Sequence, residues 1–482
     1  MKVTVVEKAD LTKTDNIFTL YQVFEDGLDD LKRYSFQSEE EQFVLARLGD
    51  FNGKIKENLY FRSPNIFLIG TGNEATRCAE QFRKSVGYLL PKIRESKVET
   101  IIVPVVDITS EECAGIVDAL ILGLYQYKED EDAKLTEIIF EVPKEKMENI
   151  QQAVSQAKVM SKSANFTRRL AATPSNMMTP KHIAGYAKEL ASENDLKLEV
   201  LGEREMSDLG MNALLAVSSG SCHEAQLIVL KYEHPEAETT LAIVGKALTF
   251  DAGGLSLKPS KTMKDMKFDK SGGSAVLGAM KAIAKLKPKV NVVGVIPSSE
   301  NVIGSHAFKP GDVLKAYNGK TIEVSDTDAE GRLILCDALA YCVDKYKPNK
   351  MINIATLTGA VIQSLGRSVA AIMGNSDSLC KELIDAGAVV HERLWQMPLY
   401  DEYKEMMKSQ YADLINLNEG REAGVIQGSI FLQEFVGDTQ WGAIDIGGTA
   451  WNYRFSSYIK ENCASGFGAR LFTQWALDSQ VK

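Results

Sequence analysis

The sequence predicts an α/β protein with two α/β domains, a smaller N-terminal one and a larger C-terminal one whose mixed sheet lies between helices. Three observations support this. Short β-branched runs alternate with longer segments of helical spacing, as in α/β folds. The chain has 482 residues, which is too many for one ordinary hydrophobic core. A long helical stretch beginning near residue 147 separates two such series of strands.

The first series precedes that stretch. We expect helices at 75–86 and 110–125, between strands at 2–6, 65–70, 100–106 and 136–142.

The stretch 147–172 is predicted to be a connecting helix. Met147, Ile150, Val154 and Ala157 keep helical spacing on one face, and Gln, Ser and Lys residues flank them. Two prolines and an asparagine then indicate a break in regular secondary structure at 173–180. We therefore expect domains at 1–146 and 173–482, joined by this helix.

The second series repeats the alternation more strongly. Helices are predicted at 272–286 and 332–346, and strands at 196–201, 225–231, 240–246, 290–296, 321–324, 351–355 and 443–446.

Composition excludes several classes of protein. The formal charge is −10 and there is no Lys/Arg-rich tract, which argues against nucleic acid as a partner. No apolar run approaches the roughly 18 residues of a membrane span, and the first residues lack the core of a signal peptide. The seven cysteines include no C-x-x-C pair, which indicates reduced, mostly buried thiols. We expect a cytoplasmic protein without membrane segments.

An acidic motif follows the strand predicted at 321–324. Asp326, Asp328 and Glu330 occupy alternate positions, so in an extended chain their carboxylates would face one another. Like charges at that distance repel, and burial strengthens the repulsion. Either something compensates these charges, or the motif is a solvated acidic turn.

Further polar residues stand where other strands of this series end. Lys246, Asp251 and Lys258 follow the strand 240–246, and Asp269 precedes the helix 272–286. Ligands of open α/β sheets gather at such strand ends. Two divalent cations would balance the charge of Asp251, Asp269, Asp328 and Glu330, and two-metal sites are a common hydrolytic arrangement. Each residue alone is typical of a turn or a surface; the ordered set favours a metal site.

The ordered set resembles the leucyl aminopeptidase (cytosol aminopeptidase) family of two-metal peptidases. The family's signature Asn-Thr-Asp-Ala-Glu-Gly-Arg-Leu is matched at 326–333, except that Asp326 replaces asparagine. Further matches lie at 244–254, 310–313, 355–359, 395–403 and 445–451, and the resemblance spans about 165–475. It implies an aminopeptidase that removes Leu-like N-terminal residues from peptides, a macro-domain-like N-terminal domain and a homohexamer.

The resemblance also implies a set of metal ligands. Asp251, Asp328 and Glu330 would hold the more readily exchanged ion. Lys246, Asp251, Asp269 and Glu330 would hold the tighter one, with Asp251 and Glu330 bridging. Oxygen-rich ligation suits Zn²⁺ and Mn²⁺, with Mg²⁺ also possible.

Catalytic and substrate-binding residues carry over in the same way. Lys258 would stabilise negative charge on the scissile carbonyl oxygen, and Arg332 would hold a bicarbonate that acts as general base. The free α-amine of the substrate would bind the tighter metal and Asp269. The specificity pocket would be lined by Met266, Thr356, Leu357, Gly359, Gly447 and Ala450.

Three positions depart from the family pattern. Lys270 replaces the usual methionine and either adds a positive charge near the site or points away. Gly447 replaces alanine, which is expected to enlarge the pocket slightly. Asp326 adds a negative charge beside the ligands. None of these changes removes a ligand.

Two other functions remain open on the sequence. A two-metal phosphodiesterase would also use carboxylates, although the acidic net charge and the lysine ligand count against it. A non-catalytic oligomer that binds DNA or protein is the second, and the complete ligand set disfavours it. The five histidines show no H-E-x-x-H spacing, so they are assigned to structure or surface.

Overall fold

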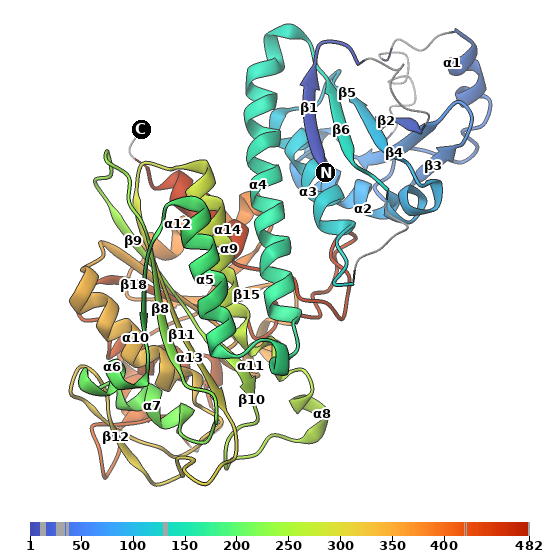
Figure 1. Ribbon diagram of the computed structural model, residues 1–482. Coiled ribbons are helices and arrows are strands. Elements are labelled where there is room, and N and C mark those ends of the chain that lie inside the picture. The colour runs from blue at the N-terminus through green and yellow to red at the C-terminus, as the bar shows by residue number, and fades with distance from the viewer. Residues whose placement is uncertain are drawn as a thin grey trace. The chain divides into compact units, whose positions relative to one another are not determined.

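The computed structural model describes residues 1–9, 16–25, 34, 38–128, 134–418, 420 and 422–480 (Figure 1). The chain divides into two compact units. The first comprises Met1–Lys162 with Phe455–Lys460, and the second comprises Ser163–Arg454 with Glu461–Lys482. The helix α4 (Met147–Ala172) runs from the first unit into the second. The domain boundaries at 146 and 172 stay a prediction.

The described part of the first unit contains a six-stranded sheet in the order β1-β6-β5-β2-β4-β3. Its pairs are parallel except β3 with β4. The strands are β1 (Lys2–Val6), β2 (Ile17–Phe24), β3 (Asn58–Phe61), β4 (Ile66–Gly72), β5 (Thr100–Pro104) and β6 (Glu137–Glu141). The four predicted strands are confirmed, and β2 and β3 were not predicted.

Helices complete this unit as α1 (Ser38–Leu45), α2 (Ala79–Ser96), α3 (Ser110–Gly123) and the start of α4. Thr109 begins α3 because its hydroxyl accepts from the N–H of Glu112, whose carboxylate accepts from the N–H of Thr109. Buried Arg83 on α2 pairs with Asp118 on α3 at 2.9 Å. The likeness to a macro domain stays a prediction.

The second unit is built on a nine-stranded mixed sheet in the order β16-β15-β18-β14-β9-β11-β8-β7, with β10 paired to β11. Its central pairs are parallel, whereas β7, β8 and β15 make antiparallel pairs. The predicted mixed sheet is therefore confirmed. Its strands are β7 (Lys197–Leu201), β8 (Gln226–Tyr232), β9 (Thr240–Gly245), β10 (Ala247–Asp251), β11 (Asn291–Asn301), β14 (Lys350–Ala355), β15 (Ala370–Gly374), β16 (Leu394–Gln396) and β18 (Gln440–Asp445).

Helices cover both faces of this sheet, as predicted (Figure 1). One layer consists of α5 (Pro180–Asn194), α9 (Ser271–Leu286), α12 (Asp377–Val390) and α14 (Ala469–Asp478). The other contains α7 (Asn212–Ser218), α10 (Gly331–Tyr346) and α13 (Gly424–Gln433), with α6 (Glu203–Asp208) beside α7. Two shorter helices, α8 (Ser260–Met263) and α11 (Ala360–Leu365), lie in the loops.

The strand predicted at 321–324 is not part of the large sheet. It forms β13 (Thr321–Glu323), the middle strand of a small sheet with β12 (Val313–Lys315) and β17 (Leu414–Ile415). The strand that the sequence predicts at 321–324 therefore exists, but it pairs with β12 and β17 and not with the strands predicted around it. The turn at 325–330 connects β13 to α10, and α10 packs on the large sheet.

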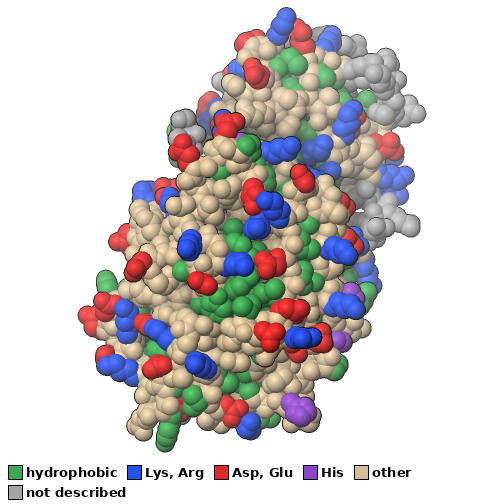
Figure 2. Space-filling view, turned by 60° about the vertical axis from the view of Figure 1, so that its left-hand side comes forward, with side chains coloured by type: hydrophobic (Ala, Val, Ile, Leu, Met, Phe, Trp, Pro, Cys, Tyr) green, Lys and Arg blue, Asp and Glu red, His purple; other side chains and the backbone are tan. Residues whose placement is uncertain are grey.

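Surface and cysteine features agree with the composition. Lys and Arg side chains are interspersed with Asp and Glu on the face drawn in Figure 2. All seven cysteines are free, and four of them are buried. Among the described helices, none has the length and apolarity that crossing a membrane requires.

Buried Asp337 on α10 ties the small sheet to the helices. Its carboxylate accepts from the backbone N–H of Leu214 on α7 at 2.9 Å and from that of Tyr317 at 2.8 Å. Tyr317 lies between β12 and β13. Burial raises the pKa of Asp337 to about 7. This carboxylate therefore anchors the chain that leads to the acidic turn.

We expect Asp337→Ala to lower the free energy of unfolding by about 1–4 kcal/mol, because the buried N–H of Leu214 left unpaired costs about 1–3 kcal/mol and the partly buried N–H of Tyr317 costs less. Urea unfolding of the purified variant measures this. Asp385→Ala is the control, since Asp385 is exposed and, among the described residues, pairs with Lys381 one turn away; it should change stability by no more than about 0.5 kcal/mol. Equal losses in both variants would contradict the anchoring role.

Candidate functional site

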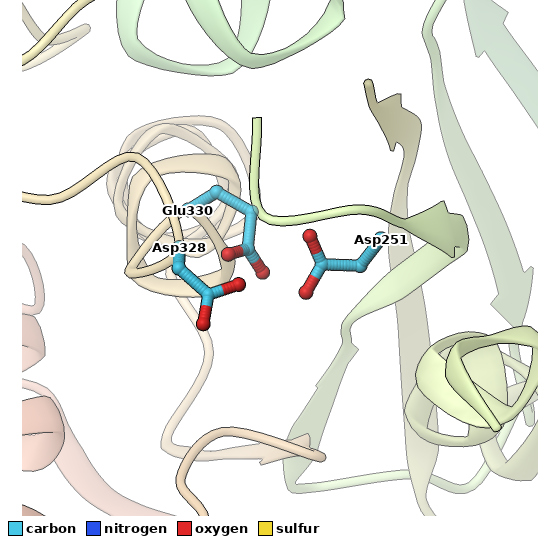
Figure 3. Close-up of side chains that lie close together, drawn as sticks. All are labelled: Asp251, Asp328 and Glu330. Carbon is cyan, nitrogen blue, oxygen red and sulfur yellow. The ribbon is translucent and has the colours of Figure 1, made fainter. Parts of the chain in front are cut away.

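Three carboxylates of the second unit point toward one another (Figure 3). Asp251 ends β10, and Asp328 and Glu330 lie in the turn before α10. Ligand oxygens of these three residues all lie within 4.8 Å of one another. Asp326 does not join them: its carboxylate accepts from the N–H of Asp328 at 2.8 Å, because the segment is a turn. The expectation that all three alternate carboxylates face one another is wrong for Asp326.

Asp251 is held in place by two donors to its Oδ1. Asn301 donates its side-chain amide at 2.9 Å, and the backbone N–H of Gly253 donates at 2.8 Å. Asn301 ends β11, which pairs in parallel with β10, so both residues reach the same sheet edge. The sequence analysis missed Asn301, although a polar residue at the end of a buried strand was the available signal.

Lys246 is buried among the ligand candidates. Its Nζ lies 2.9 Å from Asp269 Oδ2 and 2.9 Å from Glu330 Oε1, and it donates to the carbonyl of Thr356 at 3.1 Å. A Cβ at position 331 would lie 2.6 Å from this Nζ. Gly331 is therefore required for the first turn of α10 to approach the lysine.

Lys258 pairs with the other two carboxylates. Its Nζ lies 2.7 Å from Asp251 Oδ2 and also contacts Asp328. Burial lowers the pKa of each lysine, but the surrounding carboxylates outweigh it, so the pKa of Lys246 and that of Lys258 lie above the ordinary value. Both side chains are therefore ammonium groups in this arrangement.

The carboxylates are perturbed in the opposite sense. Burial, followed by the charge of Asp251, raises the pKa of Glu330 to about 8 and that of Asp328 to about 6. Burial also raises the pKa of Asp269, whose Oδ1 accepts from the hydroxyl of Thr356 at 2.5 Å. These carboxylates therefore favour a strong positive partner or a proton.

The donor set fits hard divalent cations. Oε2 of Glu330 is buried and has no hydrogen-bond partner among the described residues. A buried, unpaired carboxylate oxygen is costly unless a ligand meets it. Asp251, Asp328 and Glu330 could therefore hold one ion, and Asp269 and Lys246 adjoin them closely enough to extend the site to a second.

A cavity of about 580 Å³ opens over these groups. Eleven of the thirteen site residues predicted from the sequence line it: Lys246, Asp251, Lys258, Met266, Asp269, Asp328, Glu330, Thr356, Leu357, Gly359 and Gly447. Arg332 and Ala450 are not among its lining residues. The sequence analysis did not select the lining residues Pro259, Lys261, Thr262, Asp265, Thr358, Ile362, Arg367 and Trp451.

Arg332 lies buried in the first turn of α10. Its Nη1 donates to the carbonyl of Asn416 at 2.5 Å, whereas its Nε is buried and has no partner among the described residues. Burial lowers the pKa of Arg332 to about 10. A guanidinium nitrogen left unpaired in this way can bind a small anion.

Asp445 at the end of β18 positions the loop 356–359. Its carboxylate accepts from the backbone N–H of Leu357 at 3.1 Å and from the hydroxyl of Thr358 at 2.6 Å. A Cβ at Gly447 would lie 2.4 Å from the carbonyl oxygen of Thr358. Backbone therefore occupies the space that an alanine methyl would need here, and the expected enlargement of the pocket by Gly447 stays a prediction.

Lys270 turns away from the cavity. Its Nζ donates to the carbonyl of Lys267, and Lys270 is absent from the lining residues. The side chain is fully buried, and this burial lowers the pKa of Lys270 to about 7. Of the two possibilities left open by the sequence, the structure favours the second.

Comparison with known proteins shows the family of the chain. Residues 165–473 match the catalytic domain of the Cytosol aminopeptidase family, and residues 23–134 match its N-terminal domain. The chain is 39% identical over 448 residues to a probable cytosol aminopeptidase of Roseiflexus castenholzii, covering 89% of this chain and 91% of that protein. A protein of the same name from Desulfotalea psychrophila is 38% identical over 458 residues, covering 89% and 90%.

A third relative, from Pasteurella multocida, is also named probable cytosol aminopeptidase. It is 38% identical over 428 residues, covering 84% of this chain and 86% of that protein. These matches support a metal-dependent aminopeptidase, a peptide hydrolase, and do not favour a phosphodiesterase or a non-catalytic binding protein. The chain belongs to the cytosol aminopeptidase family.

Proposed function

We propose that this aminopeptidase removes N-terminal residues at a site for two divalent metal ions in its second unit. Asp251, Asp328 and Glu330 would hold the more readily exchanged ion, and Lys246, Asp251, Asp269 and Glu330 the tighter one. The observation that carries the proposal is the convergence of four carboxylates on one cavity, with Oε2 of Glu330 buried and unpaired among the described residues.

The reaction requires a nucleophile, a stabilised oxyanion and a proton acceptor. Two bound cations lower the pKa of a shared water and polarise the scissile carbonyl. Lys258 lines the cavity beside Asp251 and Asp328, where a fixed positive charge would stabilise the developing oxyanion. A bicarbonate held by the unpaired Nε of Arg332 would accept the proton.

Substrate would be oriented by its free amine. Asp269 lines the cavity and would accept a hydrogen bond from the α-amine, so that only the first peptide bond reaches Lys258. Met266, Thr356, Leu357, Gly359 and Gly447 line the same cavity and would contact the first side chain. Ala450 would act from behind this lining. The apolar members favour Leu-like residues.

Several properties of the working enzyme belong to the same proposal. Zinc or manganese would fill the sites, with magnesium as a weaker alternative. The protein would act on peptides in the cytoplasm as a homohexamer. Light scattering of the purified enzyme measures the assembly, and a mass six times that of the chain is expected.

We expect chelation to abolish hydrolysis of leucyl-p-nitroanilide and to lower the thermal unfolding midpoint, and Mn²⁺ or Zn²⁺ to restore both. A cation that binds only the folded state stabilises it by mass action, by about 2.7 kcal/mol at a hundredfold excess over Kd. Full activity in a protein verified to be free of metal would contradict the two-metal site.

Two aspartate variants provide the control for that experiment. Asp251→Asn removes a proposed bridging ligand, so added metal should no longer raise its unfolding midpoint. Asp326→Asn should bind and respond as the wild type does, because an asparagine oxygen can still accept from the N–H of Asp328. A loss of metal in Asp326→Asn equal to that in Asp251→Asn would contradict the ligand assignment.

The two lysines have opposite proposed protonation states, which substitution can separate. A ligating Lys246 must be neutral, and deprotonating a lysine near pH 7.5 costs roughly 4 kcal/mol, which two adjacent cations can supply. Arginine stays charged, so Lys246→Arg should lose the tighter metal and nearly all activity. Lys258→Arg should keep both metals and lose mainly kcat. Metal counting by mass spectrometry and steady-state kinetics check this.

A methionine at each position separates charge from size. Gly331 leaves little room around Lys246, so Lys246→Met tests the loss of nitrogen without a bulky guanidinium. It should also lose the tighter metal. Lys258→Met should reduce kcat by about 10²–10³ fold, as removal of an oxyanion donor does. Two tightly bound metals in both Lys246 variants would mean that Lys246 is not a ligand.

A further inference from the structure

The cavity contains a cationic side chain that the proposed chemistry does not use. Arg367 follows α11, which ends at Gly366 with φ +73°, and it lines the cavity together with Ile362 and Met266. A Cβ at Gly448 would lie 2.3 Å from the carbonyl oxygen of Gly366. Arg367 therefore lies beside the loop that contributes Gly447 to the specificity pocket.

One aromatic ring lies near the guanidinium. Its Cζ lies 6.0 Å from the ring centroid of Trp451, which stacks on Phe268 with centroids 5.6 Å apart and planes at 11°. The backbone carbonyl of Arg367 accepts from the N–H of Arg454 at 3.3 Å. The charge therefore lies at the cavity wall, at the outer limit of a cation–π contact with Trp451.

One donor of this guanidinium is left unused. Nη1 of Arg367 is buried and has no hydrogen-bond partner within the part of the chain that the structure describes. The other cations of the cavity differ, since Lys246 and Lys258 pair with carboxylates and Lys261 is exposed. Asp265 also lines the cavity, but no ion pair joins it to Arg367 in the described structure. A buried donor without a partner is costly, and in a residue that lines the substrate cavity it indicates a ligand that completes it.

We propose that Arg367 binds a carboxylate of the substrate, and this inference rests on the proposed aminopeptidase site. The planar fork of a guanidinium matches a carboxylate and is poorly matched by a neutral amide. Two parts of a peptide supply that group. One is the side chain of an N-terminal glutamate or aspartate, and the other is the C-terminal carboxylate of a dipeptide.

Two pairs of substrates, each differing by one charge, test the inference on the metal-loaded enzyme. Glutamyl- and glutaminyl-p-nitroanilide differ in the first side chain, and Leu-Gly and Leu-glycinamide differ at the C-terminus. Arg367→Met should lower kcat/KM for the charged member of at least one pair roughly tenfold or more relative to its neutral partner. The pair that responds identifies which carboxylate Arg367 binds.

Matched variants distinguish recognition from a structural role. Arg367→Lys should recover part of the charge preference, because it restores a positive charge without the fork. Lys264→Met removes an exposed cation that does not line the cavity and should leave both ratios as in the wild type. A merely structural role of Arg367 would lower both members of each pair alike, and unchanged ratios in both pairs overturn the inference.

Measuring the binding of the four compounds separates this inference from the proposed function. If the wild type cleaves none of the four compounds, the proposed function fails, and the two pairs are then compared by calorimetric titration. A preference for the charged member that disappears in Arg367→Met still supports the inference. Equal binding of both members in wild type and variant overturns it.

Discussion

The active-site region depends on the compensation of negative charge in a buried place. Asp251, Asp269 and Glu330 are buried, and Asp328 adjoins them, so their mutual repulsion is poorly screened by water. Lys246 and Lys258 compensate this negative charge, and each forms ion pairs with two of the four carboxylates. Such a cluster is stable only with cations nearby, and the same requirement makes it a receptor for divalent metals. In the proposed site, stability and catalysis would therefore rest on one electrostatic arrangement.

Residues outside the cluster determine its geometry. Asn301 and Asp445 each end a strand of the large sheet, and they orient Asp251 and the loop 356–359 through hydrogen bonds. Asp337 anchors the chain that carries β13 and its acidic turn. Gly331 permits the approach of α10 to Lys246. These residues bind no metal in the proposed site, yet a small displacement of any of them would move a ligand, and catalysis is sensitive to such displacements.

The cavity wall combines two chemical characters. Met266, Leu357 and Ile362 supply apolar surface, whereas Arg367 supplies a charge that Trp451 holds at the wall. The stack of Trp451 on Phe268 places this charge on rigid groups. If Arg367 binds substrate as proposed, this wall would discriminate by polarity as well as by size, because an unpaired buried donor penalises a substrate that cannot meet it.

The sequence by itself determined the α/β class, most strands of the second unit and the residues of the acidic cluster, because strand periodicity and the ordered motif are local properties. It did not determine β10, nor that β13 belongs to a separate sheet, since pairing depends on contacts between distant segments. The turn at 325–330 separated Asp326 from the two carboxylates that follow it, through one hydrogen bond that alternation alone does not reveal. Only the tertiary structure showed that Asn301 donates to Asp251, that Asp445 accepts from the N–H of Leu357 and that Arg367 lines the cavity. The burial and the hydrogen-bond partners of a residue depend on the segments that pack around it, and these are distant in the sequence.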